Sequence, residues 1–341
     1  EMDPETEILY VGNEEGIEKD VVPKTGYPME LVDARWLDKS SPWQLIKTGA
    51  RVAKGVLEAN RVMRKFKPDV VIGTGGYVCF PVIIAGKRFG ARTFLHEQNA
   101  FPGLANRTLE KYVNKVFLGF SDAAKYFKDP SKMVEAGNPV RKSFFSLNKT
   151  EARKKLGFPQ DDFIVFSFGG SLGAEKINEV AFELMQVVNG HEKMRMVFGT
   201  GKWYYDSIIK KAEERGIVLK DNILIKDYID DMENYLAASD LIISRAGALS
   251  VAETTVCGRA CILIPSPNVT GNHQYYNAKA VADRGGAILI EEKDLTSEGL
   301  IKEVMHLKNN PEIAEKMGRA ARACAPMKAL DIIYDEIQAA L

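Results

Sequence analysis

A glycine-rich segment in the second half of the chain has the residue types of an anion-binding turn. The apolar run Phe163–Phe168 ends at Gly169-Gly170-Ser171-Leu172-Gly173-Ala174, and a helical pattern, Glu175–Met185, follows directly. Glycine lets the backbone approach a ligand closely, and the start of a helix offers unpaired N–H groups and a positive dipole end. The segment therefore predicts a strand, a phosphate-binding turn and a helix. Plain α/β packing also uses such turns, so the residues alone leave both interpretations open.

A second strand-to-helix turn carries a carboxylate early in its helix. The run Leu241–Ser244 is followed by Arg245-Ala246-Gly247 and then by Ala248, Leu249, Ser250, Val251, Ala252 and Glu253. A carboxylate in this place can accept both hydroxyls of a ribose, as in dinucleotide-binding folds. It can also simply complement the helix dipole. Further along, Gln274 lies in the amide-rich run Gly271–Asn277, where amide side chains can contact sugar hydroxyls.

Polar residues in the first half suggest a second part of the site. His96, Glu97, Gln98 and Asn99 follow the expected strand Ala91–Leu95 and include groups that donate, accept and titrate. They fit a binding or catalytic site, or else a buried hydrogen-bonded loop that braces the fold. Arg141 fits either a surface charge or a fork of donors for a diphosphate.

Short apolar runs alternate with helical patterns in both halves and predict an α/β fold with parallel sheets. In the first half these runs are Glu7–Val11, Asp69–Gly73, Ala91–Leu95, Lys115–Leu118 and Met133–Val134; in the second they are Phe163–Phe168, Met194–Phe198, Ile223–Ile225, Leu241–Ser244, Ala260–Ile264 and Ala287–Ile290. We expect a first domain over residues 1–142, a second domain over 143–325, and a C-terminal helix over 326–341 that packs back on the first domain. The polar stretch Asn148–Asp162 is interpreted as the linker and the lead-in to the second domain, and a cleft is expected between the carboxyl edges of the two sheets.

Composition narrows the class of protein. Lys plus Arg and Asp plus Glu are both 46 in 341 residues, which argues against a strongly basic nucleic-acid-binding surface. Four cysteines and four histidines lack metal-site spacing, so no metal or cofactor is predicted and a reducing, cytoplasmic compartment fits best.

Two segments raise the question of membrane contact. The uncharged run Val70–Gly86 contains four glycines and a proline, which favours a strand, a turn and a buried helix over a membrane span. The basic segment Leu31–Gly55 carries Trp36 and Trp43, and it fits either a membrane-surface contact or amphipathic helices whose tryptophans face the core.

Seven ordered motifs resemble those of the bacterial MurG glycosyltransferases. They are GTGGYVCFP, HEQNAFPGLANR, AGNPVR, GGSLGA, YIDDM, SRAGALSVAE and NHQYYNA, between about Asp69 and Asn277. The resemblance implies the GT-B fold, with two Rossmann-like domains. It also implies inverting transfer of N-acetylglucosamine from UDP-N-acetylglucosamine to the C4 hydroxyl of the muramoyl sugar of lipid I, in peptidoglycan synthesis. The family works peripherally at the cytoplasmic face of the bacterial membrane, where anionic lipid is an expected partner.

The resemblance also implies roles for individual residues. Glu253 would hold the ribose, Ile229 would lie near the uracil and Gln274 would contact N-acetylglucosamine. Asn99 and Arg141 would reach the donor from the first domain, and His96 and Glu97 would position the acceptor or transfer a proton. The remaining donor-site positions are Ser171, Ala248, Leu249, Ser250, Val251 and Ala252, with Gly169, Gly170 and Gly173 as the phosphate loop.

Two departures from the family pattern bear on these roles. The family begins with a strand and a GGTGGH turn whose histidine is a candidate base; this sequence lacks that segment, so the first βα unit is expected to be missing. A protein without it should bind UDP but transfer poorly. Leu172 stands where many members have glutamine. Two alternatives therefore remain: a related GT-B enzyme with another lipid acceptor, such as a diacylglycerol, and an inactive UDP-sugar-binding subunit.

Overall fold

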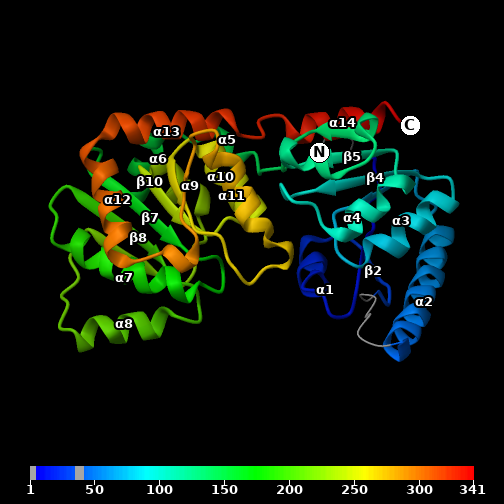
Figure 1. The fold of residues 1–341 in the computed structure, drawn as a ribbon, viewed down its shortest axis with the longest axis horizontal. Coiled ribbons are helices and arrows are strands. Elements are labelled where there is room, and N and C mark those ends of the chain that lie inside the picture. The colour runs from blue at the N-terminus through cyan, green and yellow to red at the C-terminus, as the bar shows by residue number, and fades with distance from the viewer. Residues whose placement is uncertain (1–4, 35–41) are drawn as a thin grey trace. The chain divides into compact units, whose positions relative to one another are not determined.

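The chain folds into two compact units, which are described separately (Figure 1). The computed structural model describes residues 5–34 and 42–341. The first unit spans Glu1–Gln98, Pro102–Ala136 and Leu330–Leu341, and the second comprises Asn99–Phe101 and Gly137–Ala329. The short segment Asn99–Phe101 thus groups by its contacts with the second unit, although its neighbours on both sides belong to the first.

A six-stranded parallel sheet forms the centre of the second unit. Its strands are β7 (Phe163–Phe168), β8 (Met194–Gly199), β9 (Ile223–Lys226), β10 (Leu241–Ser244), β11 (Ala260–Leu263) and β12 (Ile288–Leu289). Their spatial order is β12-β11-β10-β7-β8-β9. The chain therefore builds outward from β7 in one direction and then from β10 in the other, which is the doubly wound arrangement. The strands expected from the sequence are confirmed, with ends that differ by at most one residue.

Helices cover both faces of this sheet because each strand is apolar on both sides. They are α5 (Ser143–Ser146), α6 (Lys149–Leu156), α7 (Glu175–Asn189), α8 (Tyr205–Glu214), α9 (Met232–Ala238), α10 (Ala248–Cys257), α11 (His273–Ala282), α12 (Ser297–Asn309) and α13 (Pro311–Ala323). On one face, Ile177 and Leu184 of α7 pack with Val304 of α12 against strand residues such as Val165 and Ile243. Burial of each such side chain contributes about 1.5–3 kcal/mol relative to exposure.

The interpretation of Asn148–Asp162 as a linker is wrong, because most of it forms α6. Asn148 caps this helix by accepting a hydrogen bond from the Glu151 N–H at 2.9 Å. Arg153 is only 1% exposed, donates to the Ala238 carbonyl at 2.9 Å and pairs with Asp240 at 2.6 Å. A polar stretch is therefore anchored in the second unit through a buried arginine.

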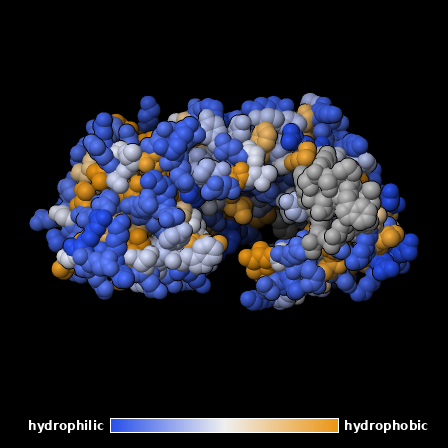
Figure 2. Space-filling view, turned by 60° about the horizontal axis from the view of Figure 1, so that its bottom comes forward, coloured by the Kyte–Doolittle hydropathy of each residue, from blue (hydrophilic) through white to orange (hydrophobic). Residues whose placement is uncertain are grey.

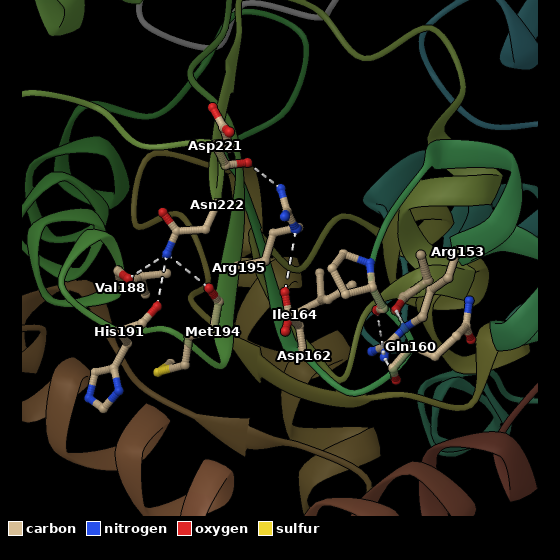
Figure 3. A network of polar contacts seen from close by, with 12 residues as sticks. Arg153, Gln160, Asp162, Ile164, Val188, His191, Met194, Arg195, Asp221 and Asn222 are labelled. Atoms are coloured by element: carbon tan, nitrogen blue, oxygen red, sulfur yellow. Dashed lines mark hydrogen bonds and ion pairs between the residues drawn. The ribbon is translucent and has the colours of Figure 1, made fainter.

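A polar network joins the amino-terminal ends of neighbouring strands in the same unit (Figure 3). The amide nitrogen of Asn222 lies 2.8–3.0 Å from the carbonyl oxygens of Val188, His191 and Met194. Arg195 approaches Asp162 at 3.7 Å and also donates to the Asp221 carbonyl. These contacts fix the loops that enter β7, β8 and β9.

The first unit contains a four-stranded parallel sheet in the order β3-β4-β5-β6 and a two-stranded sheet formed by β1 and β2. Its strands are β1 (Tyr10–Gly12), β2 (Met29–Leu31), β3 (Val70–Gly73), β4 (Arg92–Glu97), β5 (Lys115–Leu118) and β6 (Met133–Glu135), and its helices are α1 (Glu18–Val21), α2 (Pro42–Phe66), α3 (Cys79–Arg88), α4 (Leu104–Leu109) and α14 (Ala329–Gln338). The strand expected over Glu7–Val11 is shorter and lies later than predicted. The strand expected over Ala91–Leu95 runs on through Glu97.

Successive side chains of β4 and β5 point to opposite faces of the sheet, and each face has its own hydrophobic core in the first unit. Leu95 and Val116 pack in the cluster that includes α3 and the buried part of α2. Phe94 and Phe117 face the opposite way, with ring centroids 5.5 Å apart. The C-terminal helix α14 covers these two rings with Ile332, Ile333 and Ile337.

None of the helices in the described part of the chain is long and apolar enough to cross a membrane. Within Val70–Gly86 the structure has the expected strand, turn and buried helix, β3 and α3. The surface seen in Figure 2 is mainly hydrophilic, with hydrophobic residues in small groups. Trp36 lies outside the described residues and Trp43 lies near the start of α2, so a membrane contact of these tryptophans stays a prediction.

Candidate functional site

The predicted donor residues gather at the carboxyl edge of the six-stranded sheet. Strands β7 and β10 are neighbours, and Phe168 pairs in register with Ser244 at their ends. The two turns singled out in the sequence therefore leave the sheet side by side. This is the point where the strand order reverses, and open α/β sheets bind ligands outside the strand ends at such a point.

The turn after β7 needs glycine at two positions, and at one of them for a second reason as well. Gly170 and Gly173 have φ of 99° and 86°, where a side chain is strained. At Gly173 an added Cβ would also lie 2.2 Å from the Thr200 carbonyl oxygen, whereas at Gly170 it would meet open space. Ser171 and Leu172 are exposed at the tip of the turn.

The helices that follow these two turns, α7 and α10, have N-termini without a side-chain cap. The N-cap of α7 is Ala174 and the N-cap of α10 is Gly247, and neither has a side chain that accepts from the helix. The first N–H groups of α7 and α10 are therefore suited to an anionic ligand. Arg245, in the second turn, pairs with Glu292 and contacts the Ile264 and Pro265 carbonyls at 3.3 Å, so its side chain supports the loop after β11.

Glu253, a residue of α10, lies in a small charged cluster with Arg141 and Glu233. Burial is the main cause that raises its pKa; the positive charge of Arg141 opposes this shift and the negative charge of Glu233 adds to it. Arg141 pairs with Glu233 at 3.3 Å and has its guanidinium 5.2 Å from the Phe144 ring. Arg141 thus groups with the second unit, which corrects its expected place in the first domain.

Asn277 is a central residue of this region that the sequence prediction did not assign. It is fully buried, and its amide nitrogen donates to Asn99 Oδ1 and to the Ala246 carbonyl, both at 3.1 Å. Its Oδ1 accepts from the Ala100 N–H at 2.8 Å. Asn99 is thereby fixed beside the turn after β10, in the second unit. The only signal in the sequence was the presence of Asn277 at the end of the NHQYYNA run.

Two further predicted residues extend the site along the same edge. Gln274 accepts from the Ser266 N–H at 2.9 Å, which anchors its carbonyl group to the loop after β11. Ile229 follows β9, and its side chain lies 3.2 Å from where a Cβ on Gly199, the last residue of β8, would stand. Ser171, Ile229, Ala248–Glu253 and Gln274 thus share one edge of one sheet.

His96 and Glu97 lie in the first unit, as the last two residues of β4 and not in a loop after it. Both are buried, and Glu97 accepts from the Gly103 N–H at 3.0 Å and from the Asn106 side chain at 2.8 Å. Glu97 therefore holds the start of α4. These contacts match the bracing role that the sequence left open, and they leave a role of the segment in the reaction as a prediction.

The described residues contain no group of three or more His, Cys, Asp or Glu side chains able to hold a metal ion. The groups at the carboxyl edge that can bind a ligand are helix N-termini, a guanidinium, carboxylates and amides.

Two α/β units with parallel sheets, one of them doubly wound, define a protein of the GT-B class. Comparison with known families agrees. The glycosyltransferase family 28 C-terminal domain matches residues 164–333, and the family 28 N-terminal domain matches residues 1–118.

Individual relatives define the family more narrowly. A UDP-N-acetylglucosamine–N-acetylmuramyl-(pentapeptide) pyrophosphoryl-undecaprenol N-acetylglucosamine transferase of Alkaliphilus oremlandii is 40% identical over 100% of this chain and 92% of its own length. The enzyme of the same name from Acetivibrio thermocellus is 40% identical over 98% of this chain and 90% of its own. The crystal structure of Acinetobacter baumannii MurG superposes with a TM-score of 0.77 at 24% identity, covering 98% of this chain and 91% of that one. The chain belongs to the MurG family.

Proposed function

We infer that this chain transfers N-acetylglucosamine from UDP-N-acetylglucosamine to the C4 hydroxyl of the muramoyl sugar of lipid I. The products are lipid II and UDP, and the anomeric centre is inverted. Relatives that are 40% identical over almost the whole chain carry this transferase activity in their names. The observation that carries the inference is the convergence of the two uncapped helix N-termini and Glu253 at the reversal point of the second sheet.

The donor fits this edge group by group. The diphosphate would lie against the turn Gly169–Ala174 and the start of α7, where N–H groups and the helix dipole favour negative charge. Glu253 would accept the ribose hydroxyls. Ile229 would contact the uracil and Gln274 the N-acetylglucosamine, for which its amide nitrogen is suited because its oxygen is held by Ser266.

Transfer requires stabilisation of the departing diphosphate and a base for the attacking hydroxyl. The helix N-termini and the guanidinium of Arg141 would stabilise the departing diphosphate, because negative charge grows on it as the glycosidic bond breaks. His96 and Glu97 of the first unit stay candidates for the base. Of the two, Glu97 is already bonded to Gly103 and Asn106, so we propose that it positions the acceptor-side segment.

The direct test is incubation of the full-length protein with labelled UDP-N-acetylglucosamine and a lipid I analogue. We expect label in lipid II with release of one UDP for each sugar transferred. Binding of the nucleotide sugar without transfer would indicate an inactive subunit. Transfer to diacylglycerol in place of lipid I would indicate a related enzyme with another acceptor. Either result would contradict the proposal.

We further propose that the protein works peripherally at the cytoplasmic face of the bacterial membrane, in contact with anionic lipid. An undecaprenol-linked acceptor, as in the relatives' names, requires the enzyme to meet a membrane. The basic segment with Trp36 and Trp43 has the composition for such a contact.

Substitution Trp36→Glu with Trp43→Glu should weaken binding to anionic vesicles, since a charge replaces an amphipathic ring. Cosedimentation with phosphatidylglycerol vesicles measures the effect. Trp203→Glu is a matched control, because Trp203 is 72% exposed and belongs to the second unit. Equal vesicle binding by the double variant and the wild type, with both folded, would remove the tryptophans from the membrane contact.

A further inference from the structure

A basic pocket lies at the amino-terminal edge of the six-stranded sheet, opposite the carboxyl edge where the predicted donor residues gather. Its volume is about 710 Å³, and its lining includes Asn148, Lys149, Lys154, Cys257, Arg259 and Arg322. Arg259 directly precedes β11, whereas the donor residues follow strand ends, so the pocket lies at the amino-terminal edge. Its lining residues come from the start of α6, the end of α10 and the last turn of α13. An adjoining pocket of about 460 Å³ shares Arg259 and Arg322.

Positive charge dominates this pocket. Its lining contains Lys149, Lys154, Arg259 and Arg322 against one acid, Glu151. The nearby Asp240 is already occupied, because Lys149, Arg153 and the Ile164 N–H all bond to it. Asp240 therefore acts on Arg259 only through its charge, which favours the charged guanidinium, while its direct bonds go to other groups.

The two arginines have no partner within the part of the chain that the structure describes. Neither guanidinium group forms a hydrogen bond or an ion pair there, and Arg259 Nε is buried with nothing to bond to. Burial is the main cause that lowers the pKa of Arg259; the charges of Cys257 and Asp240 oppose this shift, and those of Arg153 and Arg322 add to it. Arg322 is held close by packing, since its Cβ lies 3.3 Å from where a Cβ on Gly258 would stand. A partly buried cation without a counter-charge is costly, and an anion in the pocket would offset that cost.

We propose that this pocket binds a small phosphate-bearing molecule through Arg259 and Arg322. Guanidinium groups present a planar fork of donors that matches phosphate oxygens, and two of them favour an oxyanion with more than one negative charge. The start of α6 adds to this, because Asn148 caps the Glu151 N–H and leaves the first N–H groups of the helix for a ligand. The volume lies in the range of pockets for small ligands, roughly 300–1,000 Å³. The site is separate from the donor edge and does not depend on the proposed transfer reaction.

A purely structural role makes a different prediction. In that case the arginines would rest against the carboxyl end of α10, where a helix dipole favours cations, and removing them would destabilise the protein. If the arginines form an anion-binding site, removing them should leave the unliganded protein as stable as before or more stable. The stabilisation by the anion should then be lost.

The probe is inorganic pyrophosphate, titrated calorimetrically into the protein with UDP present in excess to occupy the donor edge. We expect the wild type to bind, and the Arg259→Gln, Arg322→Gln variant to bind at least about tenfold more weakly, since charge-assisted hydrogen bonds are lost. The unfolding temperature of the wild type should rise with pyrophosphate at constant ionic strength, and that of the variant should not. Lys210→Gln with Lys302→Gln removes the same charge from exposed positions on α8 and α12 and should behave as wild type.

Vesicles of phosphatidylcholine with phosphatidic acid distinguish a lipid headgroup from a soluble ligand. Competition between these vesicles and pyrophosphate that requires Arg259 and Arg322 would identify the source as a headgroup. Binding of pyrophosphate without vesicle binding would identify it as soluble. Equal pyrophosphate affinity in wild type and double variant, no wild-type binding at millimolar pyrophosphate, or loss of unliganded stability in the variant without an anion effect would each overturn the proposal.

Discussion

At the scale of single residues, Glu253 combines a proposed binding role with a cost to stability. Its pKa is raised chiefly by burial, and Glu233 nearby adds to the shift. The folded protein therefore holds a proton on Glu253 at a pH where the unfolded chain has lost it. The free energy of unfolding then falls as pH rises above the ordinary pKa of a glutamate, about 4.3, until the raised pKa is passed.

Glu253→Gln should separate these two effects. The glutamine keeps the shape without the charge, so the variant should be as stable as the wild type at low pH and relatively more stable at neutral pH. UDP affinity should fall about tenfold or more, because ribose hydroxyls lose a charged acceptor. Chemical unfolding across pH and calorimetric titration with UDP measure the two quantities.

The pH dependence of UDP binding gives the control. Wild-type affinity should weaken as pH falls through the raised pKa of Glu253, because the protonated carboxyl accepts hydroxyls less well, and the Gln variant should lack that dependence. Unchanged UDP affinity in the variant would mean that Glu253 only complements its helix, the alternative that the sequence left open.

At the scale of elements, the turn after β7 shows how two glycines in one loop differ. Gly170 and Gly173 both have positive φ, so each resists a side chain for conformational reasons. Only Gly173 is also enclosed, by the Thr200 carbonyl and the Tyr204 ring. The matched pair Gly170→Ala and Gly173→Ala therefore compares backbone strain alone with strain plus a steric clash.

Gly170→Ala should lower the free energy of unfolding by about 1–2 kcal/mol, the cost of a left-handed alanine. Gly173→Ala should cost more and should also weaken UDP binding, because the turn must move away from Thr200 to admit the methyl group. Denaturant unfolding and UDP titration measure both variants. Equal losses in the two would show that the turn has room to shift, and that the contact with Thr200 does not fix its shape.

Sequence patterns predicted most strands here because apolar β-branched runs mark strands that are buried on both faces. They missed α6, whose composition is polar, because nothing local shows that Arg153 will be buried against Asp240. Ser171, Glu253 and Gln274 were expected in segments that follow strand ends, and the structure brings these segments to one edge of the sheet, while their roles stay predictions. Asn277 was not assigned, because its partners Asn99 and Ala100 lie more than 170 positions away in the sequence.

At the scale of the whole molecule, the chain returns to the first unit at its C-terminal end. Helix α14 covers Phe94 and Phe117 with Ile332, Ile333 and Ile337, which completes one face of the four-stranded sheet. The second unit, by contrast, has its own core between its sheet and helices such as α7 and α12. The last segment of the chain thus stabilises the unit that contains His96, although it follows the second unit in sequence.

Ile333→Asp should therefore destabilise the first unit selectively, by about 2–4 kcal/mol, because an apolar contact is lost and a charge is moved next to aromatic rings. Scanning calorimetry with and without UDP identifies the units, since UDP raises only the transition of the unit that binds it. The substitution should lower the UDP-independent transition and leave UDP affinity unchanged. Leu330→Asp is the matched control on the same helix, because Leu330 is 45% exposed and lies outside the Phe94 cluster. A single transition that Ile333→Asp lowers and UDP raises would instead mean that the two units unfold together, and that α14 stabilises the whole chain.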